Sequence, residues 1–149
     1  MFGKQFPEGI TKTCNIIDNA FSEFEKRGYS VKWAGSKNFE EYGFNLFLPN
    51  EGSLFFGIWF AYWLTSGNPV CICIDSEDQT QVQQFNSIVE RTNLAPAIEL
   101  EKFPVTYFDQ TKLMDKDCEG IIFKTLMNFC TTLNALTVNE TVTSDNEAL

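Results

Sequence analysis

Two short runs of the sequence are apolar at every side chain, and they constrain the fold more than any other feature. Residues 54–60 and 70–74 hold only aromatic, aliphatic and cysteine side chains, with Gly57 as the single break. A strand that is apolar on both faces has to be covered on both faces. Turn-forming residues precede each run, at 49–52 and 67–69. The runs therefore predict strands in the interior of a layered protein.

Alternation and helical spacing predict the remaining elements. Residues 29–33 and 42–48 alternate apolar and polar side chains, which predicts two half-buried strands beside 54–60. Apolar residues three and four apart predict helices, and the last helix begins at Asp115 or Asp117. The expected helices cover residues 9–27, 59–66 and 79–92, and the last helix carries its apolar stripe from Ile122 to Leu136. One or two strands lie between 98 and 109.

This element order predicts a mixed α+β fold. An N-terminal helix leads into a three-stranded antiparallel meander. A βαβ unit and a C-terminal helix then pack on one sheet of five or six strands. Strand 70–75, helix 79–92 and strand 104–109 form the βαβ unit if the two strands are parallel neighbours. We expect one globular domain over residues 1–136 and a disordered polar tail over 137–149.

The charge is acidic and uneven. The formal net charge is −9, and residues 75–149 carry −8 of it. The 11 basic residues are scattered, whereas phosphate-binding surfaces need clustered lysine and arginine. Nucleic acid is therefore not an expected partner. A basic protein surface is favoured, because opposite potentials steer encounter. The alternative is that the acidity serves solubility alone.

Histidine and cysteine usage excludes several classes of site. The chain has no histidine, which removes Ser-His-Asp and Cys-His catalysis and histidine metal ligands. Its five cysteines are odd in number and lack C-x-x-C spacing, which favours free thiols in a reducing cytoplasm. No nucleotide-binding motif, signal pattern or apolar run of 18 residues is present. We therefore expect no cofactor and no membrane partner.

An aromatic block marks a candidate binding surface. Nine residues between Tyr42 and Trp63 are aromatic, more than one sheet face of this size can bury. Most are expected in the core. Trp59, Tyr62 and Trp63 lie where strand gives way to helix, and these three are the predicted partner-binding anchors. Gly57, in mid-strand, is expected to allow a close approach by another backbone or ring.

An acidic cluster is the second candidate. Asp75 and Asp109 end the two strands of the expected βαβ unit, and ligands of open α/β sheets bind at that edge. With Glu77 or Asp78 added, these carboxylates are able to hold Mg²⁺. In the alternative interpretation they only cap a helix and start a turn.

A third candidate is a nuclease-type site. Over residues 9–92, the order of one helix and three strands resembles the core of restriction-endonuclease-like proteins, the PD-(D/E)XK superfamily. The resemblance implies an acidic residue on the second strand and Glu-x-Lys on the third. This chain has Asn45 on the second strand, and no lysine follows an acidic residue by two positions. The resemblance therefore implies a catalytically dead fold.

These patterns favour a non-enzymatic protein-binding or regulatory module of the immunity, antitoxin or inhibitor kind. The competing hypothesis is a Mg²⁺-dependent enzyme or nucleotide-binding domain that uses Asp75 and Asp109. A third hypothesis is a homodimer that buries the aromatic surface across a twofold axis.

Overall fold

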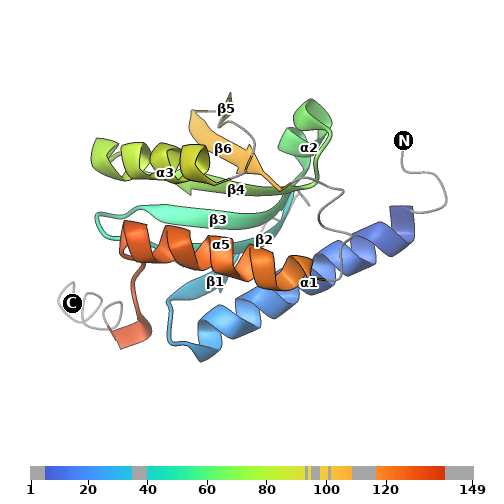
Figure 1. The fold of residues 1–149 in the computed structure, drawn as a ribbon, viewed down its shortest axis with the longest axis horizontal. Coiled ribbons are helices and arrows are strands. Elements are labelled where there is room, and N and C mark those ends of the chain that lie inside the picture. Colours follow the sequence, from blue (N-terminus) through green and yellow to red (C-terminus); the bar gives the residue numbers. More distant parts are fainter. Residues whose placement is uncertain are drawn as a thin grey trace.

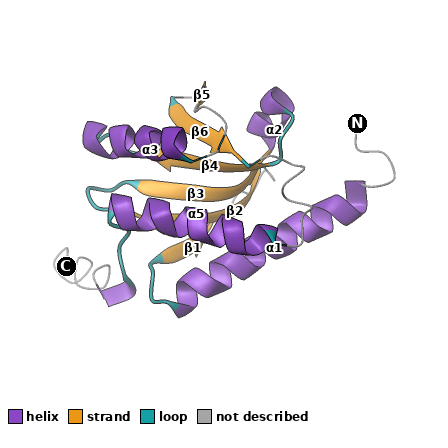
Figure 2. Ribbon diagram, in the orientation of Figure 1, coloured by secondary structure: helices purple, strands orange, loops and turns teal. Residues whose placement is uncertain are grey.

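The structure is a computed structural model, and it describes residues 6–34, 40–92, 94, 98–100, 102–108 and 117–139. These residues form helices and strands in a mixed α+β arrangement (Figures 1 and 2). The helices are α1 (Phe6–Lys26), α2 (Phe60–Ser66), α3 (Gln79–Arg91) and α5 (Cys118–Leu133). The strands are β1 (Val31–Trp33), β2 (Glu41–Phe47), β3 (Ser53–Trp59), β4 (Val70–Asp75), β5 (Ile98–Leu100) and β6 (Phe103–Tyr107).

The described strands form one sheet in the order β1-β2-β3-β4-β6-β5. Every neighbouring pair in it is antiparallel. The predicted meander of the first three strands is confirmed. The two runs that are apolar on both faces form β3 and β4. These strands lie at the centre of the sheet, and each is paired with a neighbouring strand on both sides.

The expected βαβ unit of parallel neighbours is wrong. Strand β6 lies beside β4, but it runs antiparallel to it, with Cys71 opposite Tyr107. The reason is the short hairpin of β5 and β6, which turns at Lys102 in the left-handed region (φ 77°). The hairpin reverses the chain, so β4 and β5 are the parallel strands and β6 lies between them. This is a split form of the βαβ arrangement.

Three helices cover one face of the sheet. Figure 1 shows α5 across the middle of the sheet, with α3 and α1 on either side of it. Alternate strand residues, such as Phe44, Phe56 and Ile72, point into this layer and are fully buried. Phe24 from α1, Phe85 from α3 and Phe129 from α5 pack against them in the same core. The apolar spacing within α1 and α5 predicted that Phe24 and Phe129 would be buried, and both are.

Helix ends follow ordinary capping chemistry. Gly28 adopts φ 87° after α1, as its position at the end of the helix predicts. The sequence Ser76–Gln79 resembles a capping box, but Asp78 is the N-cap of α3, and its carboxylate accepts a hydrogen bond from the Thr80 amide (2.9 Å). The Ser76 hydroxyl instead accepts one from the Asp78 amide (3.0 Å).

The described chain ends beside α1. Thr137 forms an isolated bridge with Tyr29, and the Val138 amide donates to the Gly28 carbonyl (2.9 Å). The rest of the expected tail, residues 140–149, lies outside the described residues. No helix that the structure describes is long and apolar enough to cross a membrane.

Candidate functional site

The face of the sheet turned away from α1, α3 and α5 carries a second, smaller cluster. We call it the distal face. Its buried members are Phe55, Cys71, Cys73 and Val105 from the strands and Tyr62 from α2. Strand alternation places these residues opposite the helix-facing set. Among the described helices, only α2 contributes a side chain to this cluster.

A hollow of about 250 Å³ opens on the distal face, and we call it the sheet pocket. Aromatic and polar side chains from four strands line it. They are Glu41 and Asn45 of β2, Ser53, Phe55 and Trp59 of β3, Cys73 and Asp75 of β4, and Phe103 of β6. This volume is below the roughly 300 Å³ at which small-molecule sites begin. It suits a single inserted side chain better than a cofactor.

Two glycines bring the backbones of β2 and β3 close together. Gly43 and Gly57 face each other across β2 and β3, and the backbones approach so closely that a Cβ on either would collide with the other strand. A Cβ on Gly43 would also lie 2.8 Å from Cζ of Phe55. The Phe55 ring therefore occupies the space that a side chain at position 43 would need. The close approach expected at Gly57 is confirmed, and the approaching group is the backbone of β2.

Trp59 and Phe103 close over the middle of the distal face. Trp59 pairs with Glu41 at one end of β3, whereas Phe103 starts β6 near the other end of the sheet. Their ring centroids nevertheless lie 6.2 Å apart, with the planes at 68°. The sheet must therefore curve toward this face. The curvature brings together residues that the pairing register separates.

Four polar side chains line the sheet pocket without partners among the described residues. Glu41 and Asp75 form no ion pair there, and Asn45 and Ser53 form no side-chain hydrogen bond. Burial, with a smaller contribution from Glu40, raises the pKa of Glu41 above its ordinary value. Lys32 lies beside Asn45 in the register, but it pairs with neither carboxylate. The pocket therefore presents uncompensated negative charge.

The cysteine in the sheet pocket is not a nucleophile at neutral pH. Burial raises the pKa of the Cys73 thiol to about 12, and Asp75 and Glu41 add to the shift. The thiolate is the reactive form, and both carboxylates oppose it. Within the described residues, no group of three or more histidine, cysteine, aspartate or glutamate side chains is arranged to hold a metal.

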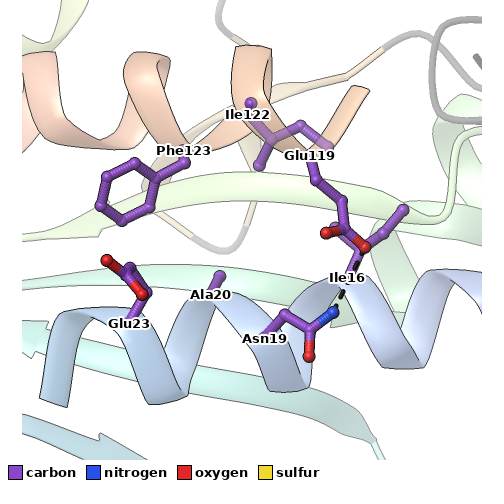
Figure 3. Close-up of a pocket in the computed structure, with 8 residues that line it drawn as sticks. Ile16, Asn19, Ala20, Glu23, Glu119, Ile122 and Phe123 are labelled. Atoms are coloured by element: carbon purple, nitrogen blue, oxygen red, sulfur yellow. Dashed lines mark hydrogen bonds between the residues drawn. The ribbon is translucent and has the colours of Figure 1, made fainter. Parts of the chain in front are cut away.

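A second hollow, of about 240 Å³, lies between α1 and α5 (Figure 3). Its two carboxylates already have partners. Glu119 accepts a hydrogen bond from the Asn19 amide (3.3 Å), and Glu23 pairs with Arg27 (3.1 Å). The Arg27 guanidinium also lies over the Phe123 ring, 4.8 Å from its centroid. The polar groups of this groove satisfy one another, so it makes a weaker candidate than the sheet pocket.

The predicted aromatic anchors separate in the structure. Tyr62 is 1% exposed and Trp63 is 8% exposed, because α2 turns both inward. Neither side chain presents a surface to a partner in this conformation. Trp59 is half-buried and lines the sheet pocket. Of the three anchors, it is the one that remains accessible.

The predicted acidic cluster separates as well. Asp75 lines the sheet pocket, while Asp78 caps α3 and accepts a hydrogen bond from Asn50 (3.1 Å). Glu77 is exposed in the turn before α3. Asp109 lies outside the described residues, and the antiparallel pairing places the carboxyl ends of β4 and β6 at opposite edges of the sheet. The edge expected to gather both carboxylates does not exist in this topology.

Sequence reasoning missed Glu41 and Phe103, and it treated Trp59 and Asp75 as parts of separate sites. The sequence did offer a reason to select Glu41. It is a charged residue at the start of β2, and β2 pairs with β3, a strand that is apolar on both faces. The contact of Phe103 with Trp59 depends on sheet curvature, for which no local pattern exists. The chain matches no protein-family model, no curated protein and no solved structure.

Proposed function

We propose that the protein is a non-catalytic binding module that receives a basic protein partner on its distal face. The observation that carries the proposal is the sheet pocket, where two carboxylates without ion-pair partners flank aromatic side chains. A cation from a partner would supply the missing counter-charge, and a ring within about 6 Å would add cation–π attraction. An immunity protein, antitoxin or inhibitor that covers a basic enzyme groove works through such a surface.

The remaining features are consistent with this proposal. A net charge of −9 would steer a basic partner toward the molecule. All five cysteines are free, which suits the proposed cytoplasmic location. The large exposed apolar side chains that the structure describes are spread over several elements, so they offer little support for a homodimer. They are Trp33, Tyr42, Phe60, Leu64, Ile121 and Val138.

The test uses fluorescence anisotropy with a labelled 12-residue peptide rich in arginine and lysine, and its glutamine counterpart. The pocket variant is the double substitution Glu41→Gln/Asp75→Asn. The control is Glu25→Gln/Glu90→Gln, which removes the same charge from exposed positions on α1 and α3, the helices on the opposite face.

We expect the basic peptide to bind the parent protein and the control, and to bind the pocket variant roughly tenfold more weakly or worse. Equal loss in the two variants would mean that net charge alone attracts the peptide. That outcome, or no binding to the parent protein, would contradict the proposal.

A further inference from the structure

We propose that the sheet pocket is a subsite for the guanidinium group of an arginine side chain carried by a protein partner. The inference rests on the proposed function and names the group that the distal face recognises. It follows from the hydrogen-bond acceptors and aromatic rings that line the pocket, and from the absence of lysine and arginine among its described lining residues.

The acceptors come from three adjacent strands. Glu41 and Asn45 belong to β2, Ser53 to β3 and Asp75 to β4, so oxygen atoms approach the hollow from several directions. A guanidinium carries five N–H donors in a planar fork and pairs with carboxylates through two hydrogen bonds at once. A lysine ammonium is a compact point charge with three donors. The dispersed acceptors therefore match arginine better.

The rings favour arginine for a second reason. Trp59 and Phe103 bring two ring systems to one pocket, 6.2 Å apart and steeply inclined. A flat guanidinium stacks on an aromatic face, and it is more weakly hydrated than an ammonium, so its transfer from water to this partly apolar hollow costs less. Cys73 and Phe55, both buried, complete the apolar lining.

The pocket fits a side chain better than a free amino acid. No lysine or arginine lines it among the described residues, so nothing there would pair with the α-carboxylate of free arginine. That carboxylate would instead face Glu41 and Asp75. An arginine within a polypeptide has no such charge. Its backbone would lie across the half-buried rings of Trp59 and Phe103.

Backbone amide NMR of the full chain tests this inference with three probes: acetyl-arginine-amide, acetyl-lysine-amide and free L-arginine. We expect the blocked arginine to shift amides around Glu41, Trp59 and Asp75, with an affinity at least about fivefold above that of either other probe. Asp75→Asn should weaken this binding roughly tenfold, because it removes a charged acceptor for the guanidinium. The variant should still fold, because Asp75 is exposed and lies outside the core. Glu90→Gln should leave it unchanged.

Each other result overturns a distinct part of the account. Equal affinity for the arginine and lysine probes would overturn the selectivity and leave the proposed function standing. Tighter binding of free arginine would replace the protein partner with a small molecule. Shifts confined to other elements, or no shifts with any probe, would overturn the subsite. If the basic peptide still required Glu41 and Asp75 in that case, the proposed function would survive without it.

Discussion

At the scale of single residues, Glu41 has two opposing effects. Its carboxylate lies partly buried beside Glu40 and has no cationic partner among the described residues. Ionisation there costs folding free energy, and the same charge is what a basic partner would meet. Binding sites often keep such locally unfavourable groups, so stability and binding should respond in opposite directions to one substitution.

We therefore expect Glu41→Gln to stabilise the protein at pH 7. A carboxyl whose folded-state pKa is raised contributes stability below its ordinary pKa and loses it as the pH rises through the raised value. At about pH 4 and below, the wild-type carboxyl is largely protonated in both states, and the advantage of glutamine should fade. Thermal unfolding should show a rise in Tm of roughly 1–3 °C at pH 7 and less at pH 4.

A lower Tm for Glu41→Gln at pH 7 would contradict this account of the residue. Glu90→Gln, exposed on α3, serves as the control and should change Tm equally little at both pH values. The expected combination of higher stability and weaker peptide binding separates a binding role from a structural one.

The glycine pair of β2 and β3 gives a second prediction at this scale. Gly43→Ala would place a methyl group against the Phe56 carbonyl, the Gly57 Cα and the Phe55 ring. Because two of these contacts are backbone, we expect a loss of about 1–3 kcal/mol in unfolding free energy by urea denaturation. Gly120→Ala, a helical position with nothing within 4 Å, should be neutral or gain up to about 1 kcal/mol. An equal effect of the two substitutions would argue against the close strand approach.

At the scale of elements, the sequence predicted type and position far better than direction. Apolar spacing located α1, α3 and α5 and most of their buried residues, because each depends only on neighbouring residues. The sense of β6 depended on a tight turn at Lys102, a residue type that rarely adopts a positive φ. That turn moved the end of β6 away from Asp75 and removed the predicted carboxylate edge.

Helix α2 provides the prediction for this scale. It buries Tyr62 against the distal face, where the ring lies 6.2 Å from that of Tyr107, and leaves Leu64 90% exposed. Tyr62→Ala should cost about 3–5 kcal/mol of unfolding free energy, whereas Leu64→Ala should change it by no more than about 0.5 kcal/mol. Chemical denaturation measures both. If Leu64→Ala lowered the unfolding free energy strongly and Tyr62→Ala left it unchanged, α2 would have to bury Leu64 and expose Tyr62.

At the scale of the whole molecule, the fold is asymmetric. One face of the sheet carries three helices, and the distal face carries the hollow with uncompensated charge. Composition predicted an acidic protein with surplus aromatic residues, and position along the predicted elements selected Trp59 and Asp75 as candidates. The sequence could not show that Trp59 and Asp75 line one pocket, because their proximity depends on the pairing register of the strands and on the curvature of the sheet.

The most direct test of the central claim is an NMR map of the surface that the basic 12-residue peptide occupies on the isotopically labelled parent protein. The account predicts that the largest amide shifts fall on β2, β3 and β4 around Glu41, Trp59 and Asp75, and that the Trp59 indole gives intermolecular NOEs to the peptide. Shifts centred instead on α1 and α5, around the groove of Glu23 and Glu119, would contradict it.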